Sequence, residues 1–200
     1  LYDVDVRILD KDQIKKDYPI VNTDDVIGGI LMPGDGAADP SGVTHMLAKA
    51  ARQEGAQIFE KSPVEEIITK GGKISGVKVK GQTIECEYIV LASGMWSRQI
   101  GEKAGVSIPL YPAEHFYIIT EPIENLSKTL PTIRDFDNRT YIKEDAGKIL
   151  VGIFEGNSIP AWDKTNKVPE DFSFGEFQEN FEHFEPYLAS AIKRFPVLET

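Results

Sequence analysis

The stretch E-Y-I-V-L-A-S-G-M-W-S, from Glu87 to Ser97, limits the fold class more than any other part of the sequence. Its apolar run from Tyr88 to Ala92 does not alternate with polar residues, which is typical of a strand covered on both faces in a parallel sheet. The run ends in Ala92-Ser93-Gly94, three residues with almost no side chain. Such a series predicts that another group comes close to the backbone there.

The elements before that stretch predict a mixed α/β fold, combining α/β and α+β features. Apolar residues recur at helical spacing between Pro40 and Gly55, so we expect a helix there. Four β-rich runs follow, Q-I-F-E, V-E-E-I-I-T, K-I-S-G-V-K-V and T-I-E-C-E, with Gly71-Gly72 and Gly81-Gln82 as turn signals. This order predicts an α/β domain whose crossover connection is partly replaced by a β-meander.

The two ends of the chain predict further short strands and two more helices. We expect strands in V-R-I-L and at 26–32, separated by a short helix that Pro19 ends. After Ile108, the runs H-F-Y-I-I-T, R-T-Y-I-K and K-I-L-V-G-I-F-E predict strands joined by the turns D-F-D-N and E-D-A-G. An aromatic stripe then predicts an amphipathic helix interrupted near Pro186; its members are Phe174, Phe177, Phe181, Phe184 and Leu188.

Charge and composition exclude several classes of partner. The formal net charge is −10, and no basic stripe is present, so we expect no nucleic-acid partner. No apolar run approaches the roughly 18 residues of a membrane helix, so we expect no membrane partner. The single cysteine, Cys86, is consistent with a cytoplasmic protein. His45, His115 and His183 are far apart in the sequence, so we expect no metal site.

Several motifs in a fixed order resemble the D-amino-acid-oxidase-like family of FAD-dependent oxidoreductases. They are the segment L-M-P-G-D-G-A-A-D-P-S-G-V-T-H-M, then V-E-E-I, then G-V-K-V-K-G, then Y-I-V-L-A-S-G-M-W-S. The later segments P-A-E-H-F-Y-I-I-T-E-P-I and L-P-T-I-R-D-F-D-N-R-T-Y-I-K-E-D-A-G-K-I-L-V-G-I-F-E look most like the dimethylglycine and sarcosine dehydrogenase branch. The resemblance runs over nearly the whole chain.

The resemblance implies a flavin enzyme that oxidises an N-methylated glycine-type amine by hydride transfer to FAD. It implies a partial, Rossmann-like FAD-binding domain at 33–108, and substrate-domain segments with a mixed, mostly antiparallel sheet at 1–32 and 109–200. The G-x-G-x-x-G segment that opens such proteins does not occur in this sequence. We therefore expect the chain to be an internal part of a longer enzyme, with an N-methyl amine as substrate and an electron-transfer protein or oxygen as acceptor.

The resemblance also assigns site residues. It places Val64 against the adenine side of FAD, and Ala92-Ser93-Gly94 beside the phosphates and ribitol, with Trp96 and Ser97 close by. The resemblance also implies that the substrate sheet faces the flavin ring. The polar aromatic residues of that sheet are therefore the candidate catalytic groups, namely His115, Tyr117 and Tyr141. Arg134 and Lys143 are candidates for holding a substrate carboxylate, and the fork of the arginine suits that role better.

Two alternative functions stay open at this point. The first is a glycine or D-amino-acid oxidase of the same superfamily. The second belongs to a different class, a non-catalytic interaction module that kept the fold without the cofactor. Uptake of FAD, seen as a flavin spectrum, would discriminate between an enzyme and such a module.

Overall fold

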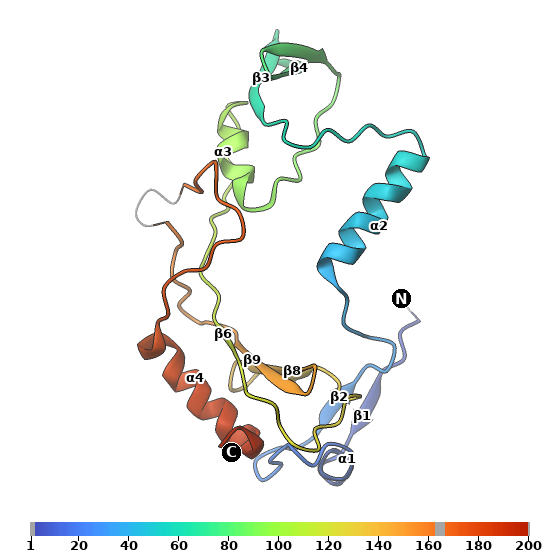
Figure 1. Ribbon diagram of the computed structural model, residues 1–200, viewed down its shortest axis with the longest axis vertical. Coiled ribbons are helices and arrows are strands. Elements are labelled where there is room, and N and C mark those ends of the chain that lie inside the picture. Colours follow the sequence, from blue (N-terminus) through green and yellow to red (C-terminus); the bar gives the residue numbers. More distant parts are fainter. Residues whose placement is uncertain (1–2, 163–166, 200) are drawn as a thin grey trace. The chain divides into compact units, whose positions relative to one another are not determined.

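The computed structural model describes residues 3–162 and 167–199, and the chain divides into two compact units (Figure 1). The first, which we call the sheet unit, comprises Leu1–Asp39, His115–Asn157 and Phe177–Thr200. The second, which we call the meander unit, comprises Pro40–Glu114 and Ser158–Glu176. The predicted segment ends at residues 32 and 108 differ from these bounds, and the roles assigned to the segments stay predictions.

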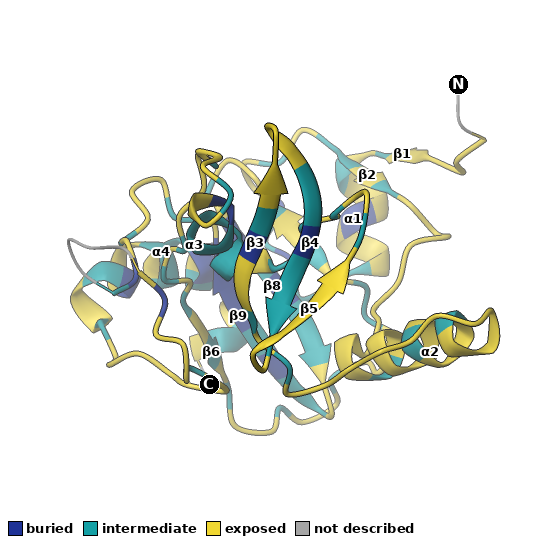
Figure 2. Ribbon diagram, turned by 90° about the horizontal axis from the view of Figure 1, so that it is seen from above, coloured by how far each residue is buried: buried dark blue, intermediate teal, exposed yellow. Residues whose placement is uncertain are grey.

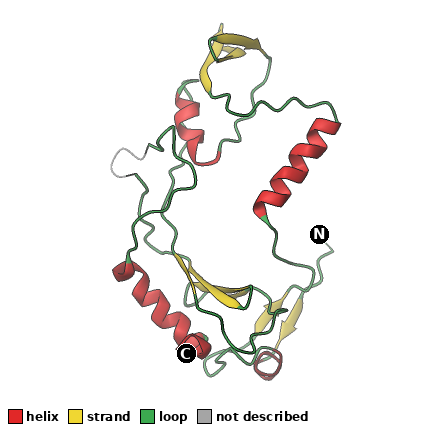
Figure 3. Ribbon diagram, viewed as in Figure 1, coloured by secondary structure: helices red, strands yellow, loops and turns green. Residues whose placement is uncertain are grey.

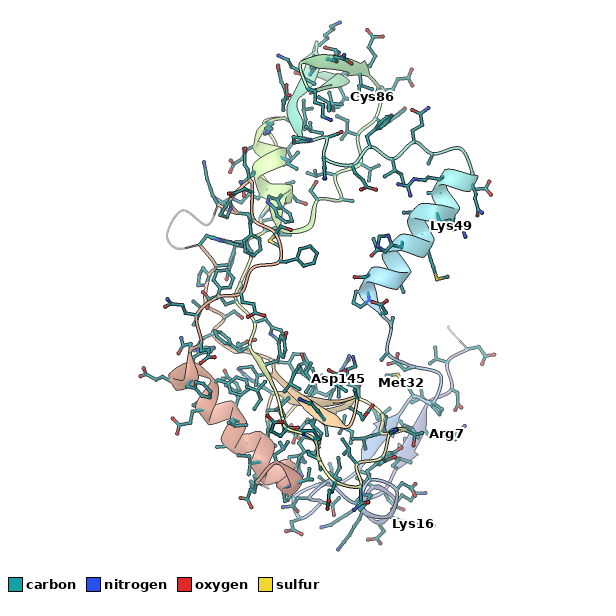
Figure 4. The ribbon with its side chains drawn as sticks, viewed as in Figure 1. Arg7, Lys16, Met32, Lys49, Cys86 and Asp145 are labelled. Carbon is teal, nitrogen blue, oxygen red and sulfur yellow. The ribbon has the colours of Figure 1, made fainter. Side chains whose placement is uncertain are left out.

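The centre of the sheet unit is a four-stranded antiparallel sheet with the order β6-β9-β8-β7 (yellow in Figure 3). The strands are β6 (Tyr117–Ile119), β7 (Ile133–Asp135), β8 (Thr140–Asp145) and β9 (Lys148–Ile153). All follow predicted runs except β7, which the sequence did not single out. A two-residue turn of Ala146 and Gly147 joins β8 to β9, and Asp145 marks its start in Figure 4. Both turn residues have positive φ, 53° and 84°, which is the type I′ pattern.

One face of this sheet forms the core. Side chains alternate between the two faces of a strand, and the fully buried ones come from alternate positions, Ile142 on β8 and Ile149, Val151 and Ile153 on β9. The helix α4 (Phe181–Arg194) packs against both strands. Its Ala191 and the following Phe195 are fully buried there, before the short 3₁₀ helix η3 (Pro196–Glu199). Burial colouring shows the dark blue residues of β9 (Figure 2).

The N-terminal elements complete the sheet unit as predicted. A two-stranded antiparallel sheet pairs β1 (Arg7–Leu9) with β2 (Gly29–Leu31). Between them, α1 (Lys11–Asp17) begins with a capping box in which the Gln13 N–H donates to Asp10 Oδ1 at 2.8 Å, and the Asp10 N–H donates to Gln13 Oε1 at 2.9 Å. The one buried residue of α1, Ile14, joins the core.

The aromatic helix is shorter than predicted at its start and continuous where an interruption was expected. Asn180 accepts the His183 N–H at 3.0 Å and begins α4, so Phe174 and Phe177 lie before the helix. Phe174 is fully exposed and has a positive φ of 49°. Pro186 lies inside α4 without ending it. His183, in the first turn of this helix, is not a solvated surface residue, because its ring lies 5.2 Å from the Phe116 ring and its Nε2 is buried.

The meander unit contains one long helix and an antiparallel meander. The helix α2 (Pro40–Gln53) matches the prediction, and Gly55 follows it with a positive φ of 90°. The strands β3 (Val64–Lys70), β4 (Lys73–Val79) and β5 (Gln82–Glu85) pair in sequence order. Their turns are Gly71-Gly72, as predicted, and Lys80-Gly81, one residue earlier than predicted. Cys86, labelled in Figure 4, follows β5 and is partly buried.

Two predicted strands of this unit do not form. The run at 57–60 has no strand pairing, and neither has the run from Tyr88 to Ala92. Tyr88 is 85% exposed and Val90 is 90% exposed, so the prediction of a buried parallel strand is wrong for this chain. A strand exists only when a neighbour pairs with its backbone, and no described residue pairs with this run.

The fold class is nevertheless confirmed as mixed α/β, with antiparallel pairing in all three described sheets. Among the described residues, no helix is long and apolar enough to span a membrane.

Candidate functional site

The face of the four-stranded sheet opposite the core carries the polar residues that the sequence singled out. The register pairs Tyr117 with Gly152, Gly152 with Tyr141, and Tyr141 with Arg134. These four residues therefore form one row across β6, β9, β8 and β7, on the same face. We call this face the open face, because Tyr117 is 54% exposed there and Arg134 is exposed as well.

A glycine in the middle of the row allows the Tyr141 ring to lie flat against the sheet. A Cβ added at Gly152 would overlap the ring and hydroxyl of Tyr141. The ring also contacts the ring of Phe154, with the centroids 5.2 Å apart, and Phe154 stacks on Phe136 at 6.2 Å. The position of the Tyr141 ring is thus set by the backbone of Gly152, which has no side chain, and by the neighbouring ring of Phe154.

His115 precedes β6 and lies beside this aromatic group. Its ring is nearly parallel to that of Tyr141, with an interplanar angle of 11° and a centroid distance of 6.4 Å. Its Nδ1 lies 3.0 Å from Oε2 of Glu155, and its side chain is 49% exposed. The structure therefore brings His115 and Tyr141 together and places Tyr117 on the same face, with Gly152 between the two tyrosines. Their catalytic roles stay predictions.

Glu155 is the residue of this group that the sequence reasoning missed. It directly follows the apolar run of β9, and its side chain is only 4% exposed. Its Oε1 accepts the Phe116 N–H at 2.9 Å, and its Oε2 faces His115. A lone carboxylate immediately after a buried strand was the available signal, because a buried carboxylate requires partners.

The surroundings of Tyr141 keep its hydroxyl neutral. Burial raises the pKa of Tyr141 above its ordinary value, and the charge of Glu155 and the Tyr117 phenol raise it further, while Arg134 opposes the shift. Since the ordinary value is already near 10, the hydroxyl is protonated at neutral pH. Tyr141 can donate or accept a hydrogen bond there, but it is not a base.

Two cations share the open face with Tyr141. Arg134 lies directly opposite Tyr141 in the register, and Lys143 lies two residues further along β8 on the same face. Neither forms an ion pair with another residue in the part of the chain that the structure describes. The open face thus offers positive charge, a phenol and an imidazole within one strand layer.

The residues predicted to touch FAD all lie in the meander unit. Ala92 and Gly94 are exposed, and Gly94 has a positive φ of 52° at the start of the 3₁₀ helix η1 (Gly94–Trp96). The Trp96 indole donates to the Pro169 carbonyl at 3.4 Å. Ser97 begins α3 (Ser97–Glu102).

Val64 begins β3 and is tied to the end of α3. The Lys103 ammonium, which follows α3, donates to the Val64 carbonyl at 2.9 Å. The start of β3 is therefore held close to the segment that follows Ala92-Ser93-Gly94. Short side chains and an accessible backbone in that segment fit a nucleotide lying along it. The residues present are compatible with FAD on this evidence, and their contacts with it stay predictions.

Comparison with known proteins identifies relatives over the whole chain. The family described as "DAO: FAD dependent oxidoreductase" matches residues 1–200. The 4-methylaminobutanoate oxidase (formaldehyde-forming) of Paenarthrobacter nicotinovorans is 36% identical over 95% of this chain and 23% of its own length. The mitochondrial pyruvate dehydrogenase phosphatase regulatory subunit of Mus musculus is 35% identical over 97% of the chain and 22% of its own. Human mitochondrial sarcosine dehydrogenase is 34% identical over 99% of the chain and 22% of its own.

A solved structure shows the same fold. The L-proline dehydrogenase of P. horikoshii superposes with a TM-score of 0.80 at 25% identity, covering 98% of this chain and 50% of that one. The chain spans about a quarter of the length of the curated relatives that it matches.

Proposed function

The chain belongs to the DAO family of FAD-dependent oxidoreductases, and we propose that it is part of a longer flavoenzyme that oxidises an N-methylated, amino-acid-like amine. Dimethylglycine and sarcosine are the substrates we propose first. Relatives named as sarcosine dehydrogenase and 4-methylaminobutanoate oxidase support this class of substrate. A glycine or D-amino-acid oxidase activity is the alternative within the family, and a glycine oxidase from Bacillus cereus shares the fold with a TM-score of 0.66.

The single observation that carries the proposal is the row of residues on the open face. An N-methylated amino acid has a carboxylate at one end and an amine at the other. Arg134 supplies a guanidinium whose fork matches a carboxylate, directly opposite Tyr141 in the register. Tyr141 supplies a neutral hydroxyl, and His115 an imidazole, for the amine end. Substrate binding across this row would orient the amine without requiring a strong base.

Each residue has a defined role in this proposal. FAD, when bound, supplies the acceptor for the hydride equivalent that leaves the carbon next to the amine nitrogen. Arg134 binds the carboxylate, with Lys143 as a second cation, and Tyr141 and His115 hold the amine so that this carbon faces away from the sheet. Tyr117 limits the row on its other side. Val64 would contact the adenine side of FAD. The other residues that would contact FAD are Ala92-Ser93-Gly94, Trp96 and Ser97.

The test uses the full-length protein that contains this chain. Flavin reduction is followed at the flavin absorbance with dimethylglycine, sarcosine and glycine as separate substrates. We expect His115→Ala and Tyr141→Phe each to slow reduction by tenfold or more, the usual range for a positioned acid–base or orienting group being about 10²–10⁴. His45→Ala and Tyr111→Phe are matched controls, because both residues lie in the meander unit and are exposed. Unchanged rates in both site variants would contradict the site assignment.

A specific similarity also favours the non-catalytic alternative. The regulatory subunit of pyruvate dehydrogenase phosphatase is as similar to this chain as the named oxidase, at 35% against 36% identity. A full-length protein that stays colourless and takes up no added FAD would support a regulatory module over an enzyme.

An enzyme whose flavin is reduced by the amine would still need an electron acceptor, and we propose oxygen or an electron-transfer protein. The cytoplasmic location inferred from the single cysteine remains part of the proposal.

A further inference from the structure

Glu155 is a deeply buried carboxylate beside the open face, and no role was predicted for it from the sequence. Its side chain is 4% exposed, while the His115 side chain that it meets is 49% exposed. Both of its oxygens are occupied, one by the Phe116 N–H at 2.9 Å and the other by His115 Nδ1 at 3.0 Å. A carboxylate in this position accepts hydrogen bonds and donates none when it is ionised.

The neighbours of Glu155 hold it in place from several sides. The next N–H, of Gly156, donates to the Tyr187 hydroxyl of α4 at 3.2 Å. A Cβ added at Gly156 would overlap the Arg139 guanidinium, so that side chain lies against the backbone just after Glu155. The Phe116 ring contacts the His183 ring of α4. The carboxylate therefore has little freedom to turn away from His115.

We propose that Glu155 is a positioning residue that fixes the tautomer of His115, with the proton on Nδ1 and the lone pair on Nε2. Only a protonated Nδ1 can donate to Oε2, and a neutral ring then has an unprotonated Nε2. A free imidazole side chain favours the opposite form, so the pair reverses the intrinsic preference. Nε2 becomes the acceptor for the N–H of a protonated substrate amine. This last step rests on the proposed function, whereas the tautomer itself does not.

The Phe116 N–H explains why an amide cannot replace the Glu155 carboxylate without changing the tautomer of His115. In Glu155→Gln, one amide oxygen replaces two acceptors. The backbone N–H of Phe116 is partly buried and is paired with the buried Glu155 carboxylate, so we expect it to keep that oxygen. Leaving this donor unpaired costs more than a change at the half-exposed His115 ring. The amide NH₂ then faces His115 Nδ1, which must become an acceptor. The substitution should therefore move the proton from Nδ1 to Nε2 rather than merely loosen the ring.

The experiment measures the tautomer directly in the folded protein labelled with ¹⁵N-histidine. Long-range ¹H–¹⁵N correlations are recorded near pH 9, where imidazole rings are neutral. This chain contains three histidines, and His115→Gln assigns the ring of interest by loss of its signals. In the wild type we expect Nδ1 of His115 to carry the proton. In Glu155→Gln we expect the majority tautomer to be reversed. Glu121→Gln, an exposed substitution with the same charge change, should leave the spectrum unchanged.

Two results would overturn the proposal. One is a wild-type His115 that carries its proton mainly on Nε2, a measurement that needs no variant to fold. The other is a folded Glu155→Gln protein with the proton still on Nδ1. Neither readout requires FAD or substrate, so failure of the proposed function is distinguishable. If wild-type His115 carries its proton on Nδ1 but His115→Ala does not change flavin reduction, the Glu155–His115 pair is confirmed and its role in the proposed reaction is contradicted.

Discussion

The Arg194 side chain connects three segments of the sheet unit, and its removal gives the clearest stability prediction. Its Nε donates to Asp135 Oδ2 at 2.6 Å, and its Nη1 donates to the Asn22 carbonyl at 2.6 Å and to Asp25 Oδ1 at 2.7 Å. The side chains of Arg194 and Asp135 are only 10% and 9% exposed. The end of α4, the end of β7 and the loop before β2 thus meet at one guanidinium.

The substitution Arg194→Met keeps the length of the side chain and removes every donor. Removing one partner of a buried ion pair typically lowers the free energy of unfolding by about 3–5 kcal/mol, because a buried charge is left uncompensated. Asp135 keeps two hydrogen bonds from Asn138, at 3.1 and 2.7 Å, and Asp25 is half exposed. Both facts place the expected loss at the lower end, about 3 kcal/mol.

Urea denaturation measures this loss. With a slope of about 1.5–3 kcal/mol per molar, the midpoint should fall by about 1–2 M. Lys193→Met is the matched control, since Lys193 is the adjacent residue, is 71% exposed and lies 3.4 Å from Asp25; its effect should stay within about 0.5 kcal/mol. The double variant Arg194→Met/Asp135→Asn should recover part of the loss. A loss below about 1 kcal/mol, or no recovery in the double variant, would refute the argument that the unpaired charge of Asp135 causes most of the loss in stability.

Four further predictions follow from single positions. Gly152→Ala should displace the Tyr141 ring and lower the free energy of unfolding by about 1–3 kcal/mol, the usual range for overpacking, measured by urea denaturation. Ala146→Asn should raise the unfolding temperature, because Asn tolerates positive φ and an L-residue such as Ala is strained there by roughly 1–2 kcal/mol. Burial alone would raise the pKa of Asp135, but hydrogen bonds from Arg194 and Asn138 outweigh it and lower that pKa. Its contribution to stability is therefore complete above the unfolded-state value of 3.8 and is lost as the pH falls through the lower folded-state value; stability measured from pH 5 downward should fall less steeply in Asp135→Asn. Ala92→Leu should leave the unfolding temperature unchanged, because Ala92 is exposed, and should weaken FAD uptake in the full-length protein, followed by flavin absorbance.

The sequence predicted elements whose stability is local or comes from the next element along the chain. The capping box at Asp10 and Gln13, the paired glycines after β3 and the alternation in β8 and β9 are all encoded within a few residues. The run from Tyr88 to Ala92 failed as a prediction because a strand that does not alternate depends on distant neighbours. The prediction failed at Phe174 for a different, local reason, since the helix begins only at the cap of Asn180 and helical spacing alone did not extend it further.

In the candidate site, too, some residues could be predicted from the sequence and others could not, because they depend on distant neighbours. The family resemblance pointed to the substrate sheet, and residue type within that sheet then singled out His115, Tyr117 and Tyr141. Glu155 could not be paired with His115, since the two are 40 positions apart and meet only through the register of β6 on β9. Gly152 was equally hidden, because its importance lies in which residue the neighbouring strand places beside it. Register between distant strands is set by the whole sheet and is not encoded at either residue.

Small residues mark close approach at two places in this chain, and the two cases have different causes. At Gly152 the approaching group belongs to the protein, because a Cβ there would meet Tyr141. At Gly94 a Cβ would have no described atom within 4 Å, and only its positive φ favours glycine. The neighbouring Ala92 is exposed as well. Packing within the described chain therefore accounts for the first glycine but gives no reason for short side chains in Ala92-Ser93-Gly94. The proposed contact with FAD would supply a reason, so FAD uptake by Ala92→Leu tests the proposal more sharply than its stability does.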